Sequence, residues 1–314
     1  MKVLLTGREG QLGTALQASL PEGISLIATG RSELNLADAA ACRQAVLEHR
    51  PDWVLNAGAY TAVDRAESEA DLALAINAGA PQAFAEALAE TGGRLLQVST
   101  DFVFNGAQGS PYRPDQSLQP LGVYGATKAA GETAALALPG ARVLRTSWVY
   151  GPVGKNFCLT MLRLHAMKAA AGEPLGVVAD QVGCPTSTHT LAAACWRAIG
   201  ADSAVASTNA SAYASAVIEG PRILHWSDAG AATWYDFAMA IGELGEATGL
   251  LERAAVVRPL STADYPTPAQ RPSYSLLDCS TSRQALSLAP LHWRSALAEV
   301  LARIPAADPL GPSP

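Results

Sequence analysis

The sequence predicts a doubly wound α/β protein with a parallel sheet and a smaller C-terminal α/β lobe. Short runs of leucine and β-branched residues alternate with alanine-rich helical stretches through the first half. The connections between these runs are long enough for crossover helices, which is typical of parallel pairing. With 314 residues, 49% of them hydrophobic, the chain is long enough to form one large core and a second smaller one.

The predicted elements follow this alternation in order. Strands are predicted at 2–6, 24–28, 53–56, 94–98 and 141–145, and helices near 11–19, 39–49, 71–91 and 122–137. Beyond residue 151 the pattern is less regular, with helices predicted at 156–170, 187–199, 233–248 and 293–303, and short strands near 175–178 and 254–258.

These elements divide the chain into two predicted domains. Residues 1–150 form the first, which segments near 180–200 and 222–230 are expected to join, and 151–314 mainly form a substrate-binding lobe. The Ala- and Ser-rich residues 201–221 are expected to form a flexible loop, and the proline-rich tail 305–314 to be disordered.

Composition excludes several classes of partner and site. A formal net charge of −6 and a charged fraction of 16% disfavour nucleic-acid binding, which relies on clustered Lys and Arg. The apolar run at residues 1–7 is too short for a signal peptide or a membrane helix, so we expect a cytoplasmic protein without a membrane partner. Five scattered cysteines without a Cys-x-x-Cys pair indicate neither a disulfide framework nor a zinc site.

Three glycines follow the first strand, at Gly7, Gly10 and Gly13, where a helix is predicted to begin. Without Cβ atoms the backbone can turn tightly and approach a pyrophosphate, which the free N–H groups and the helix dipole stabilise. The alternative is an ordinary tight turn between strand and helix. The position in the first βα unit favours a Rossmann-type dinucleotide site.

The residues after the second strand bear on the choice of dinucleotide. NAD sites usually place an acid there for the ribose 2′-hydroxyl, whereas this chain has Gly30, Arg31 and Ser32, so we interpret the acid as missing. Arg31 and Ser32 suit a 2′-phosphate and predict NADPH, with NADH still possible. A solvated loop charge is the alternative for Arg31.

Tyr124 and Lys128 stand four positions apart at the start of the helix predicted at 122–137, so their side chains share one face. A ketone that receives hydride needs a proton at its developing alkoxide, and a phenol with an ordinary pKa of about 10 can supply it. We expect the lysine ammonium to lower that pKa. The pair therefore predicts reduction of a carbonyl group.

The strand before this helix runs into Thr100 and Asp101, at the edge of the sheet where open α/β proteins bind ligands. We expect Thr100 to hydrogen-bond the reacting carbonyl oxygen. A hydroxyl that caps a turn is the alternative use of the same residue.

Taken together, these motifs resemble the extended short-chain dehydrogenase/reductases, and more narrowly the dTDP-4-dehydrorhamnose reductase family. The similarity spans nearly the whole chain. The segments that carry it are 7–13, 56–64, 99–104, 124–128, 145–150, 180–186, 265–268 and 271–272.

The resemblance implies an NADPH-dependent reduction of the C4 ketone of dTDP-4-dehydro-6-deoxy-L-mannose to dTDP-L-rhamnose, for cell-envelope polysaccharide. It implies Tyr124 as proton donor, Lys128 at the nicotinamide ribose and Thr100 at the reacting oxygen. The implied cofactor-lining residues are Gly7, Gly10, Gln11, Leu12, Gly13, Gly30, Arg31, Ser32, Asn35, Leu36, Ala59, Tyr60 and Thr61. The implied substrate-binding residues are Val63, Asp101, Trp148, Asn156 and Arg271, with Lys155 and Phe157 beside Asn156.

The chain departs from the family at a few positions. Asn35 and Leu36 replace an acid pair near the adenine, and Thr14 and Ala15 offer no glutamate for a metal-bridged dimer, so we expect no metal and a monomer or homodimer. Two other functions stay open: a nucleotide-sugar epimerase or dehydratase, and a non-catalytic NADP-binding regulatory subunit.

Overall fold

The computed structural model describes residues 1–200 and 220–304. The flexible loop predicted at 201–221 lies outside the described residues except for 220 and 221, and the tail predicted to be disordered, 305–314, lies wholly outside them.

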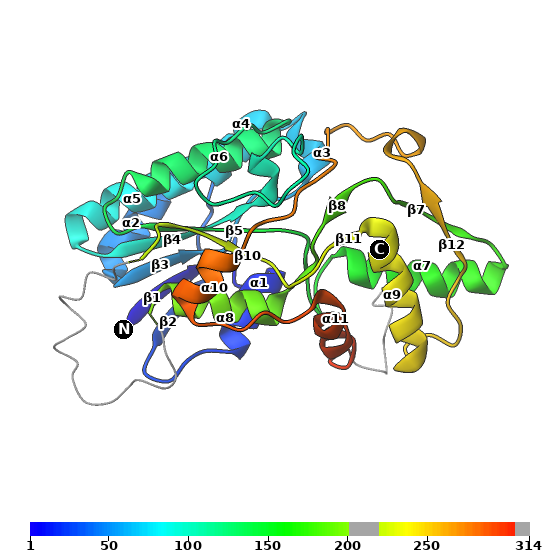
Figure 1. The fold of residues 1–314 in the computed structure, drawn as a ribbon. Coiled ribbons are helices and arrows are strands. Elements are labelled where there is room, and N and C mark those ends of the chain that lie inside the picture. Colours follow the sequence, from blue (N-terminus) through cyan, green and yellow to red (C-terminus); the bar gives the residue numbers. More distant parts are fainter. Residues whose placement is uncertain (201–219, 305–314) are drawn as a thin grey trace.

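A six-stranded sheet forms the centre of the larger part of the molecule (Figure 1). Its strand order is β10-β5-β4-β3-β1-β2, and every neighbouring pair is parallel. This arrangement confirms the predicted doubly wound α/β class. The strands are β1 (Lys2–Thr6), β2 (Ser25–Thr29), β3 (Trp53–Asn56), β4 (Arg94–Thr100), β5 (Arg142–Thr146) and β10 (Ile223–Trp226).

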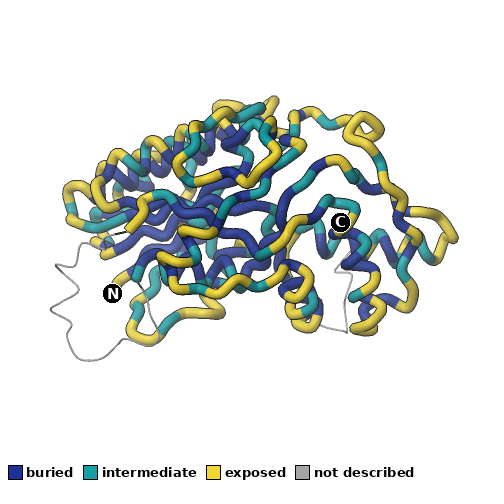
Figure 2. The backbone as a smooth tube through the Cα atoms, in the orientation of Figure 1, coloured by how far each residue is buried: buried dark blue, intermediate teal, exposed yellow. Residues whose placement is uncertain are grey.

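Helices cover both faces of this sheet, because successive side chains of a strand point to opposite faces. In β1, Leu4 packs in one hydrophobic core, whereas Val3 and Leu5 pack in the other. Figure 2 shows the strands buried between the two helical layers. The layer on the Leu4 side contains α2 (Ala39–His49), α5 (Ala80–Thr91) and α6 (Val123–Leu136), and the opposite layer contains α1 (Gln11–Ala18), α8 (Thr188–Ala198) and α10 (Ser280–Leu286).

A separate core holds the smaller lobe together. Its main helices, α7, α9 and α11, bury side chains such as Leu162, Phe237 and Leu297 against one another. The helices are α7 (Phe157–Ala171), α9 (Trp234–Ala247) and α11 (Trp293–Leu301). Three strand pairs accompany them: β6 (Val149–Tyr150) with β9 (Thr186–Ser187), β7 (Leu175–Val178) with β12 (Val257–Leu260), and β8 (Val182–Gly183) with β11 (Ala232–Thr233).

The structure differs from the predicted elements in a few places. The helix predicted at 71–91 consists of α4 (Ala70–Leu74), the π-helical η1 (Ala75–Gly79) and α5. The strand predicted at 254–258 is β12, at Val257–Leu260; its Pro259 is tolerated because the two-stranded sheet leaves β12 an open edge. No strand was predicted where β10 lies, since a four-residue apolar run is ambiguous by periodicity. The short α3 (Val63–Ala66), η2 (Asp101–Val103) and η3 (Thr262–Asp264) complete the fold.

A buried ion pair ties α6 to the sheet. Glu132 of α6 and Arg145 of β5 are each only 2% exposed in their side chains, and the carboxylate and guanidinium lie 2.7 Å apart. Arg145 also donates to the Pro114 carbonyl at 3.1 Å and lies over the ring of Phe104. Within 1–200 and 220–304, no helix combines the length and apolarity that a membrane span requires.

We predict that Glu132→Gln lowers the free energy of unfolding by about 3–5 kcal/mol, because Arg145 is left as a buried charge without its counter-ion. Urea unfolding followed by circular dichroism measures this loss. Glu90→Gln is the matched control, since it breaks an exposed pair with Arg43 of similar length, 2.7 Å, and should change the free energy by less than about 1 kcal/mol. Equally small losses in both variants would contradict the anchoring role of Glu132.

Candidate active site

Polar side chains at the carboxyl ends of β1 and β3 and in the middle of the adjacent β4 form a hydrogen-bonded row. The Thr6 hydroxyl of β1 donates to Asn56 Oδ1 of β3 at 2.6 Å, and Asn56 Nδ2 donates to Gln97 Oε1 of β4 at 2.7 Å. The Thr6 hydroxyl also accepts from the Gly58 N–H at 3.0 Å. This row joins the ends of β1 and β3 to each other and to the loop after β3.

The glycine loop between β1 and α1 is closely packed against its surroundings. Gly7 has a φ of +71°, and a Cβ on Gly13 would lie 2.1 Å from the Gly7 carbonyl oxygen, so both positions require glycine. Gly10 precedes α1 without a side-chain cap, and the first turn of α1 carries no acid. The first N–H groups of α1 are therefore available to an anion.

The side chains of Leu12 and Gln11, both predicted to line the cofactor, have different surroundings. Leu12 is buried in the sheet core, so only its backbone faces the loop. The Gln11 amide oxygen accepts from Asn156 Nδ2 at 2.9 Å, which ties the start of α1 to the start of α7.

The interpretation that an acid is missing after β2 is wrong. Residues 30–34 turn back on themselves, with the Leu34 N–H donating to the Gly30 carbonyl at 2.9 Å. This turn brings Glu33 to the strand end, where its carboxylate accepts from the Gly30 N–H at 2.8 Å, a contact that holds the pKa of Glu33 below its ordinary value. Arg31 and Ser32 are exposed on the same turn.

The other residues predicted to line the adenosine half lie close by. Asn35 is exposed and its Oδ1 accepts from the Ala37 N–H at 3.2 Å, so it serves the local turn. The Leu36 side chain lies against Gly58, at 2.6 Å from the place that a Cβ of Gly58 would occupy. Leu36 thus lies beside the loop that follows β3.

The loop after β3, which contains Ala59, Tyr60 and Thr61, is held by a residue that the sequence analysis missed. The buried Asn77 accepts from the Tyr60 N–H at 2.9 Å, and its Nδ2 donates to the Tyr60 carbonyl and to Thr127 Oγ1, both at 3.1 Å. Asn77 lies in the π-helical η1, a distortion often found at functional sites. No sequence pattern identifies that distortion.

Thr100, Asp101 and Tyr124 come together where β4 ends. The Thr100 hydroxyl donates to Asp101 Oδ1 at 3.0 Å and accepts from the Phe102 N–H at 3.2 Å, so Thr100 does cap the short η2. It also interacts with the phenol of Tyr124 in the first turn of α6. Thr100 therefore both caps η2 and lies beside the Tyr124 phenol.

The electrostatics of these groups follow from burial. Burial raises the pKa of Tyr124 to about 12, which the interaction with Thr100 partly opposes and the Asp101 carboxylate reinforces. Asp101 is 1% exposed, and burial raises its pKa to about 6 against hydrogen bonds from Ser275 and Thr100. At neutral pH the phenol is therefore protonated.

Lys128 lies one turn further along α6, and its ammonium donates to the Val98 carbonyl of β4 at 2.7 Å. Burial lowers the pKa of Lys128 to about 8, while the Glu132 carboxylate acts in the opposite direction. The expectation that Lys128 lowers the pKa of Tyr124 is not met in this structure, because burial dominates at the phenol and the ammonium is bonded to the strand.

Two contacts set the position of α6. Glu67 accepts from the Val123 N–H at 2.9 Å and so caps the first turn of the helix. A Cβ on Gly125 would lie 2.2 Å from the Phe102 carbonyl oxygen, so only glycine allows α6 to approach the end of β4 this closely.

The residues predicted to bind substrate are spread across the junction of the two lobes. Val63 begins α3, after the β3 loop, and is partly buried. Trp148 stacks on Trp234 of α9, with ring centroids 3.6 Å apart. The Asn156 side chain accepts from the Leu159 N–H at 2.9 Å and thereby caps α7.

Arg271 makes an ion pair instead of presenting a free cation. Its guanidinium donates to both carboxylate oxygens of Asp64, at 3.0 and 2.8 Å, and to Thr267 Oγ1. This pair holds the pKa of Asp64 below its ordinary value and joins the C-terminal segment to α3.

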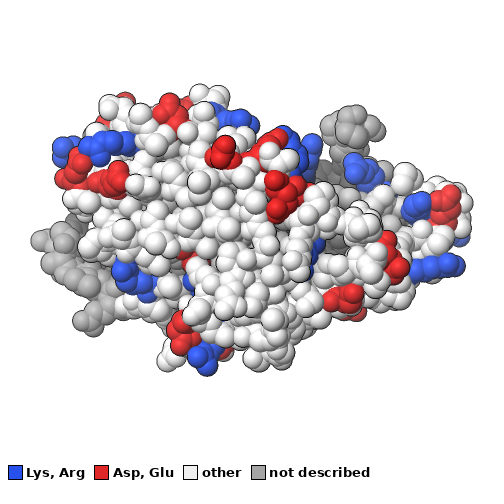
Figure 3. All heavy atoms as spheres, turned by 90° about the horizontal axis from the view of Figure 1, so that it is seen from above, with Lys and Arg blue, Asp and Glu red and all other residues white. Residues whose placement is uncertain are grey.

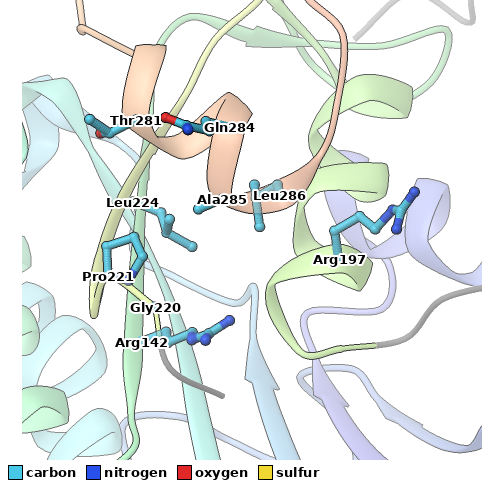
Figure 4. Close-up of a pocket in the computed structure, with 9 residues that line it drawn as sticks. All are labelled: Arg142, Arg197, Gly220, Pro221, Leu224, Thr281, Gln284, Ala285 and Leu286. Atoms are coloured by element: carbon cyan, nitrogen blue, oxygen red, sulfur yellow. The ribbon is translucent and has the colours of Figure 1, made fainter.

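A cavity of about 350 Å³ lies elsewhere, near the amino ends of β5 and β10 (Figure 4). Its lining includes Arg142 at the start of β5, Pro221 just before β10 and Leu286 of α10. Open α/β sheets bind their ligands at the carboxyl ends of the strands, so this cavity is not part of the candidate site.

On the face shown in Figure 3, acidic and basic residues are interspersed on a surface that is mostly uncharged. Among the described residues, no three His, Cys, Asp or Glu side chains are grouped as metal ligands.

Comparisons with known proteins identify relatives that match nearly the whole chain. The family model described as RmlD substrate binding domain matches residues 1–305. A Streptomyces griseus protein named dTDP-4-dehydrorhamnose reductase is 42% identical, over 94% of this chain and 91% of its own.

Two solved structures carry the same name. The protein from Clostridium acetobutylicum is 34% identical, with a TM-score of 0.82 and coverage of 96% of this chain and 98% of its own. The protein from Bacillus anthracis, in complex with NADP, is 31% identical, with a TM-score of 0.82 and coverage of 95% and 98%.

The raised pKa of Asp101 predicts a pH-dependent stability. Its folded value of about 6 lies above the ordinary 3.8, so its contribution is fully present below about pH 4 and is lost as the pH rises to about 6. The unfolding free energy of the protein relative to Asp101→Asn should therefore fall between pH 4 and pH 6, by at most about 1.4 kcal/mol per pH unit. Urea unfolding at four pH values measures the difference, and a rise over this range would refute the assignment.

Proposed function

Because this chain belongs to the RmlD family of dTDP-4-dehydrorhamnose reductases, we propose that it uses NADPH to reduce the C4 ketone of dTDP-4-dehydro-6-deoxy-L-mannose to dTDP-L-rhamnose. The family predicted from the sequence motifs is confirmed by the family model and by relatives that match nearly the full chain. The observation that carries the proposal is the grouping of Thr100, Asp101 and Tyr124 at the end of β4, with Lys128 one turn along α6.

The cofactor is assigned from the fit of the loops to a dinucleotide. The first turn of α1 and the glycine loop suit the pyrophosphate, since they offer N–H groups without a side-chain cap and no acid in the first turn. The adenosine half would lie by Gly30–Ser32 and Leu36, and the nicotinamide half by Ala59–Thr61, Tyr124 and Lys128. The Bacillus anthracis relative, solved with NADP, supports this choice, and NADH remains an alternative cofactor.

Proton transfer is assigned to Tyr124. Its raised pKa keeps the phenol protonated near neutral pH, so it can donate a proton to the C4 oxygen as the negative charge develops there. When bound, the reduced nicotinamide supplies the hydride. The Thr100 hydroxyl, which interacts with the phenol, would donate its proton to the same oxygen in place of Asp101.

Lys128 has a supporting role in this proposal. Its pKa of about 8 leaves the ammonium mostly charged at neutral pH, where it can stabilise a phenolate left after proton transfer. An ammonium has three donors, so Lys128 could keep its hydrogen bond to Val98 and still donate to the nicotinamide ribose.

The sugar is assigned to the junction of the lobes. Val63, Asp101 and Trp148 would contact the hexose, and Asn156 and Arg271 the nucleotide half. To bind the diphosphate, Arg271 would have to leave its ion pair with Asp64. The Asn156 side chain already caps α7, so Asn156 would contribute by fixing the start of that helix. We assign residues 1–150, with segments near 180–200 and 222–230, to cofactor binding, and the remainder mainly to substrate.

The cellular location and the assembly of the protein are part of the same proposal. We propose that the protein works in the cytoplasm as a monomer or homodimer, on a small nucleotide sugar destined for cell-envelope polysaccharide. The buried, unpaired state of its five cysteines suits a reducing compartment.

Tyr124→Phe should lower turnover by about 100- to 10,000-fold, because the proton donor is lost while the ring remains. The assay supplies the purified protein with NADPH and the 4-keto deoxysugar nucleotide and follows the loss of nicotinamide absorbance. NADPH affinity, measured by fluorescence titration, should stay within about threefold, because the phenol contributes little to binding.

The matched control is Tyr235→Phe, which removes a phenol hydroxyl from α9, in the smaller lobe. It should leave turnover within about twofold, as expected for a substitution outside the site. Undiminished turnover in Tyr124→Phe would overturn the catalytic assignment.

A further inference from the structure

Three charged side chains lie beside the glycine loop: Arg8 is 2.8 Å from the Glu33 carboxylate and 3.7 Å from the Glu9 carboxylate, so Glu33 is its closer partner. Arg8, the residue after Gly7, donates from its guanidinium to Glu33 Oε1 at 2.8 Å. The other oxygen of the same carboxylate accepts from the Gly30 N–H at 2.8 Å. One carboxylate thus connects the loop after β1 to the end of β2.

This position corresponds to the ribose of the adenosine half. The Arg8 N–H donates to the Thr29 carbonyl at 3.1 Å, which places Arg8 alongside the last residue of β2. In dinucleotide folds the group after the second strand contacts the ribose 2′ position, as a carboxylate for a hydroxyl or a guanidinium for a phosphate. Here both kinds of group are present and are paired with each other.

We propose that Arg8 and Glu33 form an exchangeable pair that sets the choice of cofactor. Arg8 leaves Glu33 to bind the 2′-phosphate of NADPH, whereas Glu33 accepts the 2′-hydroxyl when NADH binds. This inference rests on the proposed function, because it concerns the same dinucleotide site.

The exposure of the pair allows the exchange. The Arg8 and Glu33 side chains are 37% and 42% exposed, and an exposed ion pair is weak, so a phosphate with more charge competes well for the guanidinium. Arg31 is also exposed, and no hydrogen bond or ion pair joins it to a described residue, so it adds a second cation at the same place. Glu33 is then the residue that lowers the preference for NADPH and retains NADH as a usable cofactor.

The test is the affinity of the purified full chain for NADPH and for NADH, by fluorescence titration without sugar substrate. Glu33→Gln should tighten NADPH binding by about tenfold and weaken NADH binding by several fold, because Arg8 keeps only its longer 3.7 Å contact with Glu9 and the charged acceptor is lost. Arg8→Gln should weaken NADPH binding by about tenfold or more and leave NADH within about threefold.

Glu90→Gln is the control, because it removes the carboxylate from the exposed Arg43–Glu90 pair on α2 and α5, and it should leave both affinities unchanged. An unchanged ratio of the two affinities in Glu33→Gln, or an equal loss for both dinucleotides in Arg8→Gln, overturns the exchange. If the unmodified chain binds neither dinucleotide, the proposed function is wrong as well. If it binds both, and the substitutions leave the ratio of NADPH to NADH affinity unchanged, only the exchange between Arg8 and Glu33 is wrong.

Discussion

The buried ion pair between Glu132 and Arg145 is the constraint on which the rest of the site depends. Arg145 pairs in register with Ser99 of β4, one residue before Thr100, so the pair fixes α6 at the level where β4 ends. Lys128 lies one turn before Glu132 on the same helix, and the Glu132 carboxylate supports its charged form against burial. The Glu132–Arg145 pair therefore positions α6, and its carboxylate partly offsets the lowering of the Lys128 pKa by burial.

Much of the fold was predictable because it depends on local patterns. The first five strands and the helices between them follow from runs of leucine and β-branched residues that alternate with alanine-rich stretches. Glycine at 7 and 13 marks the loop because only a missing Cβ fits there. The spacing of Tyr124 and Lys128 places both on one face of α6, a property of any helix.

The remainder depends on contacts that sequence patterns do not reveal. Glu33 reaches the end of β2 only because residues 30–34 reverse direction, which neighbouring residues alone do not indicate. Asn77 acquires its partners from a π-helical distortion and from α6, 50 positions away. The pKa of Tyr124 follows burial rather than the distance to Lys128 along the chain. Such features arise from tertiary packing and appear only once the layers are assembled.

The stacked indoles at the junction have a consequence for how the molecule can be observed. Trp148 follows the sheet with a left-handed φ of +46°, uncommon for a bulky residue, and lies nearly parallel to Trp234 of the smaller lobe, at 7°. Chromophores this close share their excited states. Near-ultraviolet circular dichroism will therefore contain a signal from this coupled pair, and the unlabelled protein will report whether the two rings remain stacked.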